Sequence, residues 1–174
     1  MGFSLDAIER TFTNEGFNLG RFLAHFEPWV ITLNIFGICF RMQVASLYNI
    51  NNIAELYQAG SGIERTPQDI LDAAERAYNL ARAMNVREGF ARKDDCLPDF
   101  VYTQPIKRPD RGTEIPFMNY QGTKTLTKED ADKDLDDYYM ERGWTKNGVP
   151  GKEILFKYGL DWVAEALEKG GFYK

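Results

Sequence analysis

The chain has little of the residue types that bind metals or act as nucleophiles: its 174 residues include one histidine and two cysteines. The cysteines, Cys39 and Cys96, cannot form a disulfide framework for a chain of this length, so a reducing, cytoplasmic setting is expected. Neither cysteine belongs to a CxxC pair, and His25 has no second histidine beside it. The sequence therefore predicts no zinc site of the usual kinds.

Signatures of several large protein classes are also missing. No apolar run approaches the ~20 residues needed to span a bilayer; the most apolar stretch is VITLNIFGICF, residues 30–40. The net charge of -5 does not suggest a nucleic-acid partner. The acidic, amphipathic N-terminus is unlike a signal peptide, and no GxSxG, P-loop or Rossmann glycine motif occurs. We therefore expect neither a nucleic acid nor a membrane as a partner.

Helical periodicity dominates what is present. In SLDAIERTF, Ser4 is placed as an N-cap. The apolar residues that follow share one face of the predicted helix. They are Leu5, Ile8 and Phe12. Residues 22–48 are too long and too apolar for one exposed helix, so we expect burial on most sides and a start or a kink at Pro28.

Two further helices are predicted from their end signals. INNIAELYQAGSG indicates a short helix stopped by Gly60 and Gly62. The clearest helix covers residues 67–84, since Thr66 is a good N-cap and Pro67 suits the first helical position. Its apolar stripe contains several alanines, which imply the close approach of a neighbouring helix. The stripe is Ile70, Ala73, Ala74, Ala77, Leu80, Ala81 and Met84.

Regular patterning returns at LTKEDADKDLDDYYMERGW, with Thr127 as N-cap and Gly143 at the end of the helix. We expect a buried face there, formed by Leu135, Tyr138 and Tyr139. PGKEILFKYGL and DWVAEALEKGG indicate two more short helices.

Between these helices the pattern fades, from residue 85 to about residue 126. Prolines at positions 98, 105, 109 and 116 interrupt this stretch. A loop of this length is unusual inside a compact domain, so it is either functional or wraps a surface supplied from elsewhere. No convincing hairpin or βαβ alternation is visible. The predicted fold class is therefore mainly α: one irregular helical domain over residues 1–174 with a long ordered loop at about 85–126.

The residues that could carry chemistry are few. His25 could act as a base or a metal ligand, but no residues near it in the sequence suggest an orienting group and an oxyanion site. Cys39, in NIFGICF, is either a small buried hydrophobe or a thiolate ligand to an iron–sulfur cluster, which would need further ligands from elsewhere. Composition and spacing leave both alternatives for Cys39 open.

Three segments resemble one known family. NVREGFARKDDCLPDF, residues 85–100, is similar to the NxREGxxRKDDxLPxR segment of the tungsten-containing aldehyde ferredoxin oxidoreductases. LDDYYMERGWTKNGVPGKEILFKYGL resembles the LDEYYxxRGWxxxGxPxxEKLxxLGL segment of that family, and NIFGICF resembles its second DxxGLC segment. Order and spacing agree with the helical C-terminal domain of the family over about residues 25–160.

The resemblance implies a role for the end of the apolar run. In the family, the cysteine of DxxGLC is one of four thiolate ligands to a four-iron, four-sulfur cluster, and the segment lies against a tungsten-bound pterin. Carried over, Cys39 becomes the cluster ligand, and Phe40 lies near the pterin. Ile38 replaces a leucine of the same cofactor-binding segment, so the resemblance implies that it too lies at the cofactor. Asn34 stands where the family has an aspartate that binds pterin amino groups, so the contact loses a charge but keeps an acceptor oxygen.

The charged residues of the 85–98 segment then have a structural interpretation, because ion pairs at a domain junction specify geometry. We interpret them as structural rather than catalytic, and Cys96 as incidental. The charged residues are Arg87, Glu88, Arg92, Lys93, Asp94 and Asp95. No residue of the chain is assigned a catalytic role.

The family's N-terminal β-rich domain, its first DxxGLD segment and its CxxCxxxC run have no counterpart in this sequence. We therefore expect a C-terminal fragment or a split part of a larger enzyme that oxidises aldehydes to carboxylic acids. Its expected partners are the N-terminal and middle domains, ferredoxin and a second copy in a homodimer. The alternatives are a piece of a benzoyl-coenzyme A reductase-type catalytic subunit, a non-catalytic helical scaffold or interaction module, and, with least support, a stand-alone enzyme using His25.

Overall fold

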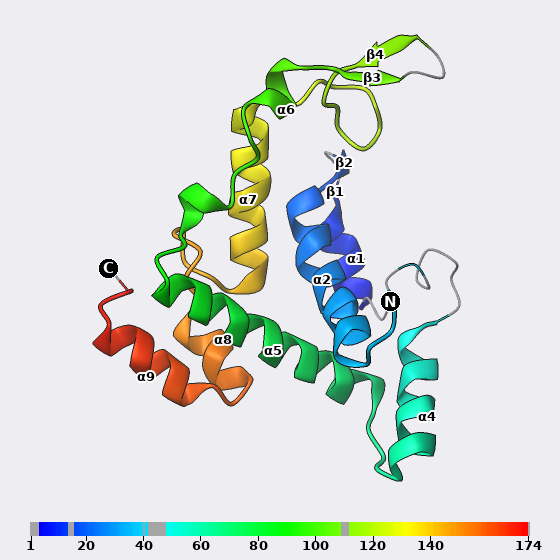
Figure 1. The fold of residues 1–174 in the computed structure, drawn as a ribbon, viewed down its shortest axis with the longest axis vertical. Coiled ribbons are helices and arrows are strands. Elements are labelled where there is room, and N and C mark those ends of the chain that lie inside the picture. The colour runs from blue at the N-terminus through cyan, green and yellow to red at the C-terminus, as the bar shows by residue number, and fades with distance from the viewer. Residues whose placement is uncertain (1–3, 14–15, 40, 42–47, 109–111, 174) are drawn as a thin grey trace.

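The computed structural model describes residues 4–13, 16–39, 41, 48–108 and 112–173, and its architecture is mainly α, as predicted (Figure 1). The elements in chain order are α1 (Leu5–Thr11), β1 (Phe12–Thr13), β2 (Gly16–Phe17), α2 (Leu19–Ile35), α4 (Ile50–Ser61), α5 (Pro67–Arg87), the 3-10 turn η1 (Arg92–Asp94), α6 (Phe100–Thr103), β3 (Ile106–Arg108), β4 (Thr113–Ile115), α7 (Lys128–Arg142), α8 (Lys152–Lys157) and α9 (Asp161–Lys169). No helix within these described ranges is long and apolar enough to cross a membrane.

Three helices form the frame of the fold. Helices α2 and α7 pack together, and α5 runs across the end of the pair, in contact with α2 (Figure 1). Helices α2 and α7 approach closely at Gly20, where a Cβ atom, if one were added, would lie 1.9 Å from the backbone oxygen of Asp134. Only glycine lets the two backbones approach this closely.

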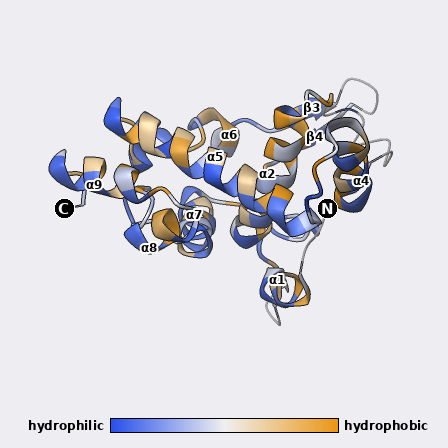
Figure 2. Ribbon diagram, turned by 90° about the horizontal axis from the view of Figure 1, so that it is seen from below, coloured by the Kyte–Doolittle hydropathy of each residue, from blue (hydrophilic) through white to orange (hydrophobic). Residues whose placement is uncertain are grey.

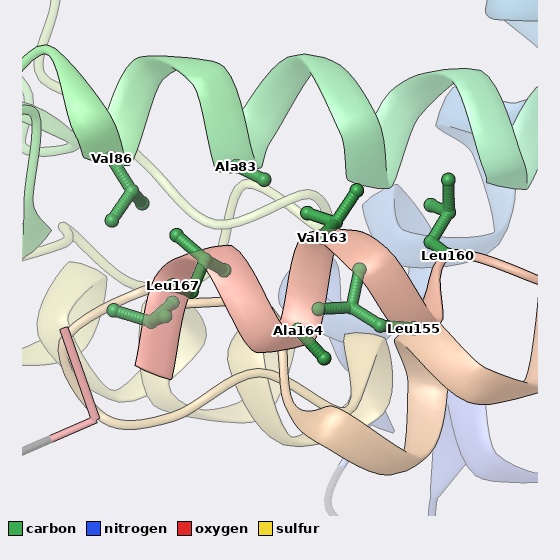
Figure 3. Close-up of a cluster of buried hydrophobic side chains, with 8 residues drawn as sticks. Ala83, Val86, Leu155, Leu160, Val163, Ala164 and Leu167 are labelled. Carbon is green, nitrogen blue, oxygen red and sulfur yellow. The ribbon is translucent and has the colours of Figure 1, made fainter. Parts of the chain in front are cut away.

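The hydrophobic core is divided between the two ends of α5. One cluster joins α2, α4 and the start of α5, around Trp29, Leu33 and Ile53. The other joins the end of α5 to α8 and α9; Figure 3 shows Ala83 and Val86 of α5 above Val163 and Leu167 of α9. Helix α5 also carries hydrophilic residues along its length (Figure 2). It therefore buries a different face at each end.

This arrangement corrects the predicted stripe on α5. Ile70 and Ala74 are buried as expected, but Ala73 and Ala81 are exposed and Met84 is 57% exposed. The buried positions in the second half are Asn79, Arg82, Ala83 and Val86. A single stripe at helical spacing assumes one packing partner, whereas α5 changes partners along its length.

The end signals of the helices were predicted correctly where they depend on local chemistry. The Ser4 hydroxyl accepts from the Ala7 N–H at 3.1 Å, and Thr66 and Thr127 each form a capping box. Gly143 ends α7 in the left-handed conformation. Gly62 does the same for α4, whereas Gly60 lies within that helix rather than stopping it.

The apolar face of α1 points away from the core. Leu5 is 80% exposed and Phe12 is 60% exposed, whereas Ala7 and Thr11 of the same helix are buried. The prediction of a buried face on α7 is partly confirmed. Tyr139 is buried, and Leu135 and Tyr138 are half-buried.

The expectation of no hairpin was wrong. Strands β1 and β2 pair antiparallel, and so do β3 and β4, which lie within the long loop together with η1 and α6. Each of these strands has two or three residues. That length is too short for an alternation of apolar and polar residues to be recognised.

Pro28 lies inside α2 rather than at its start. A proline in a helix has no N–H for the carbonyl four residues earlier, which here is that of Ala24. Arg142 of α7 supplies the missing donor, because its Nη1 lies 3.1 Å from the Ala24 oxygen. The same nitrogen donates to Glu75 of α5 at 3.1 Å. One guanidinium therefore links α2, α5 and α7.

Aromatic rings cover the rest of this buried guanidinium. Its carbon lies 4.5 Å from the ring centroid of Tyr78 and 5.3 Å from that of Trp144. The Nε and Nη2 atoms have no hydrogen-bond acceptor among the described residues, so the π-faces provide their electrostatic compensation. The residue is 4% exposed, which leaves little room for water as a substitute partner.

A double-mutant cycle tests whether Arg142 compensates for Pro28. Arg142→Met leaves the half-buried Glu75 without its cation and should lower the free energy of unfolding by about 3 kcal/mol. In the Pro28→Ala background, Ala24 gains a backbone donor, so the same change should cost about 1 kcal/mol less. Urea unfolding of the four proteins gives both values. Additivity of the two substitutions within about 0.4 kcal/mol would contradict the compensation.

Candidate functional site

The segment NIFGICF ends α2 with a specific capping motif. The Gly37 N–H donates to the Asn34 oxygen at 3.1 Å, and the Ile38 N–H donates to the Leu33 oxygen at 2.8 Å. Gly37 has φ 66°, the left-handed conformation. This pair of bonds is the Schellman motif, which satisfies the last carbonyls of a helix and turns the chain sharply away.

Ile38 and Cys39 follow the cap directly. Ile38 is half-buried and packs against the core cluster around Leu33, the hydrophobic contact that accompanies this motif. The next residue, Cys39, is a free, exposed cysteine, and Asn34 is exposed in the last turn of α2. The structure thus brings Asn34, Ile38 and Cys39 to one end of the helix. Phe40 lies outside the described residues.

A single exposed thiol defines the chemistry available here. Thiolate is the usual protein ligand of iron–sulfur clusters, each of which needs several ligands. Among the residues that the structure describes, no three His, Cys, Asp or Glu side chains are grouped so that they could hold a metal ion. Cys39 is therefore a single exposed thiol, and by itself it cannot complete a site of that kind.

The segment 85–98 is held by a charged clamp. The Arg82 guanidinium binds Asp95 through two parallel bonds, Nη1 to Oδ1 at 2.8 Å and Nη2 to Oδ2 at 2.5 Å. The Tyr139 hydroxyl also donates to Asp95, and Arg82 Nε donates to the Gly148 oxygen at 2.7 Å. We call these contacts the Arg82–Asp95 clamp. It joins α5, α7 and the turn after α7 to the start of the long loop.

The remaining charged residues of this segment differ in their contacts and in their exposure. Arg92 pairs with Asp136 of α7 at 2.7 Å. Asp94 accepts from the Ala91 N–H at 2.9 Å and so closes its own turn. The others, Arg87, Glu88 and Lys93, are exposed. The segment therefore pairs with α5 and α7 rather than satisfying its alternating charges internally. Cys96, at its end, is exposed, and its thiol donates to the Lys93 oxygen at 2.9 Å.

A second feature is a cavity of about 570 Å³ between α2, α5, α7 and the long loop. Glu27 lies on its wall and accepts a hydrogen bond from the Tyr138 hydroxyl at 2.6 Å. The Tyr78 hydroxyl lies 3.1 Å from that of Tyr138. Burial raises the pKa of the Glu27 carboxyl above its ordinary value, and burial together with the Glu27 charge raises the pKa of Tyr78 to about 12.

Sequence reasoning alone did not select Glu27. It stands in the run HFEPWV as the one acidic residue in an apolar segment, and that isolation was its only signal. His25 was a candidate from the sequence. Its Nε2 atom lies 2.7 Å from Oε1 of Glu141. Glu141 also binds Arg10 at 2.8 Å, so His25 belongs to a small charged cluster beside α1.

Comparison with known proteins points to one family. The family model described as aldehyde ferredoxin oxidoreductase, domains 2 and 3, matches residues 5–160. Tungsten-containing aldehyde ferredoxin oxidoreductases of Pyrococcus furiosus and Pyrococcus abyssi are 29% identical over 108 residues and 27% identical over 109 residues, which is 61% and 62% of this chain. The matched stretch is 16% of the length of each relative.

One solved structure is also similar to this chain in fold and in sequence. The active-site complex BamBC of benzoyl-coenzyme A reductase with 1,5-dienoyl-CoA is 30% identical, with a TM-score of 0.55 over 73% of this chain and 16% of that one.

The Arg82–Asp95 clamp yields a stability prediction. Asp95→Asn keeps a hydrogen-bond acceptor for Tyr139 but leaves the charge of Arg82, whose side chain is 9% exposed, without its partner. We expect the free energy of unfolding to fall by about 2 kcal/mol, because a charged hydrogen bond is lost at a partly exposed site.

The neighbouring Asp94→Asn is the control, measured by the same urea unfolding. Its amide oxygen can still accept from the Ala91 N–H, so the loss should stay within about 0.5 kcal/mol. Equal losses in the two variants would show that the clamp does not hold the segment.

Proposed function

Because the chain belongs to the aldehyde ferredoxin oxidoreductase family, as the match over residues 5–160 shows, we propose that it is the helical domain of a tungstopterin and iron–sulfur enzyme. The complete enzyme would oxidise an aldehyde to a carboxylic acid and pass the two electrons to ferredoxin. The names of the Pyrococcus relatives support tungsten, aldehyde and ferredoxin. The remaining domains of such an enzyme are the first partners that this proposal requires.

The observation that carries the proposal is the presentation of Cys39. Cys39 directly follows a Schellman cap and the half-buried Ile38, which packs against the core, yet it is exposed. A purely structural cysteine would gain by burial as a small hydrophobe. An exposed, positioned thiol suits a ligand shared with another part of an enzyme.

The residues at this end of α2 would each have a different role toward the cofactors. Cys39 would hold one iron of a four-iron cluster as its thiolate. Asn34 would offer its side-chain amide, both donor and acceptor, to a pterin edge, and Phe40 would lie beside that ring system. Ile38 would hold this segment in place through its packing against the core cluster. Bound there, the pterin and its metal supply the redox chemistry, while the protein orients and tunes them.

Two other functions stay as alternatives. The likeness to BamBC favours a benzoyl-coenzyme A reductase-type catalytic subunit, in which the same helical domain would serve a reduction. A non-catalytic scaffold or interaction module derived from the family is the other alternative, and it predicts no bound iron in the complex. These functions differ in metal content and substrate, so one purification separates them.

The test is to purify the protein without oxygen from its source cells, with an affinity tag on this chain. Iron and tungsten are measured by mass spectrometry together with the visible absorbance and the co-purifying polypeptides. Cys39→Ser should remove most of the cluster absorbance, because one of its thiolate ligands is lost. Cys96→Ser, the other exposed cysteine, is the matched control and should leave it unchanged.

The outcomes separate the alternatives. Oxidation of aldehydes by the purified complex supports the proposed enzyme, whereas reduction of benzoyl-coenzyme A without aldehyde oxidation supports the reductase. A complex without iron, or with the same iron content in both cysteine variants, would reject a ligand role for Cys39 and favour the scaffold.

A further inference from the structure

The cavity between α2, α5, α7 and the long loop has no role in the function proposed above. Its volume, about 570 Å³, falls within the range of small-molecule sites. Helices contribute Leu23, Ala81 and Leu135 to the lining, and the loop contributes Tyr102 and Phe117. The lining is therefore mainly aliphatic and aromatic, which suits a ligand with an apolar body.

The cavity has a polar end. Glu27 of α2 lies there with the hydroxyls of Tyr138 and Tyr78, joined in the hydrogen-bonded series Tyr78–Tyr138–Glu27 with distances of 3.1 and 2.6 Å. Tyr138 donates to one oxygen, Oε2, of Glu27. Series of this kind fix the direction of a side chain, so the carboxyl group is held in place before a ligand arrives.

The charges around the cavity favour a cation, because carboxylates outnumber cations among the residues that line it. The carboxylates are Glu27, Asp95, Asp132 and Asp134, and the cations are Arg82 and Lys128.

Both cations are already paired with carboxylates. Arg82 is bound by Asp95, and Lys128 lies 3.2 Å from Asp99. The charge of Arg142 also attracts the Glu27 carboxylate, but Arg142 forms its ion pair with Glu75. Among the described residues, Glu27 thus has a hydrogen-bond donor but no ion-pair partner of its own.

We propose that this cavity binds an aromatic primary amine, with its ring against the apolar wall and its ammonium group at Glu27. The ring gains from the removal of apolar surface from water. An ammonium group beside a partly buried carboxylate forms a charge-assisted hydrogen bond, which a hydroxyl would form more weakly. A carboxylate in the same place meets repulsion from Glu27, Asp132 and Asp134. The site is thus selective for the head group as well as for the ring.

The experiment compares three ligands that share an indole and a two-carbon arm: tryptamine, tryptophol and indolepropionate. Isothermal titration calorimetry with the full chain, free of metal, gives their affinities. Tryptamine should bind at least tenfold more tightly than tryptophol, and indolepropionate should not bind. Equal affinities of all three would overturn the proposal, as would an absence of tryptamine binding.

Variants locate the site. Glu27→Gln, nearly equal in shape, should weaken tryptamine at least tenfold and leave tryptophol unchanged. Ala131→Phe places a ring in the cavity and should abolish both, so it keeps the test valid if Glu27→Gln does not fold by circular dichroism. Glu9→Gln, on the exposed surface of α1, should change nothing. Unchanged tryptamine affinity in folded Ala131→Phe would place binding elsewhere. Because no metal is present, these results are independent of the role of Cys39.

Discussion

The hydrogen bond from Arg142 to the Ala24 carbonyl is the interaction on which the arrangement of the three main helices depends. Pro28 leaves that carbonyl without its helical partner, in the interior of the protein, where an unpaired acceptor is costly. The guanidinium that replaces the partner comes from α7, and its charge is balanced by Glu75 of α5. The hydrogen bond that Pro28 removes from α2 is thus replaced by one from α7. The new bond and the ion pair to Glu75 specify how α5 and α7 lie against α2. Buried charges of this kind contribute more to a defined geometry than to net stability.

A second arginine acts in the same way nearby. Arg82 lies 5.1 Å from the Trp144 ring centroid, on which Arg142 also packs, and it binds Asp95 of the long loop. Arg82 and Arg142 thus share one tryptophan, and Arg82 connects the helical frame to the start of the long loop. This explains how a stretch rich in proline can follow a defined path over α7. It also explains why the wall of the cavity is formed partly by that loop.

Local signals in the sequence predicted the helices and their ends, because an N-cap such as Thr66 and a left-handed glycine such as Gly143 need only neighbouring residues. Tertiary partners decided the rest. The exposed side of α5 at Met84 could not be predicted, since α5 changes partners along its length. Glu27 was missed because its burial depends on Tyr138, which lies far away in the sequence. Asn34 and Cys39 both lie at one exposed end of α2, and their roles toward a cofactor stay predictions.

The central claim is that α2, ended by the Schellman motif at Gly37, presents Cys39 to a cluster whose other ligands lie elsewhere in the enzyme. The most direct measurement is a cryo-electron-microscopy map of the complex purified without oxygen from its source cells. We predict continuous density from the Cys39 sulfur to an iron of the cluster, with Asn34 facing the pterin. A cluster with four ligands from other segments, and Cys39 out of bonding distance from it, would contradict the account.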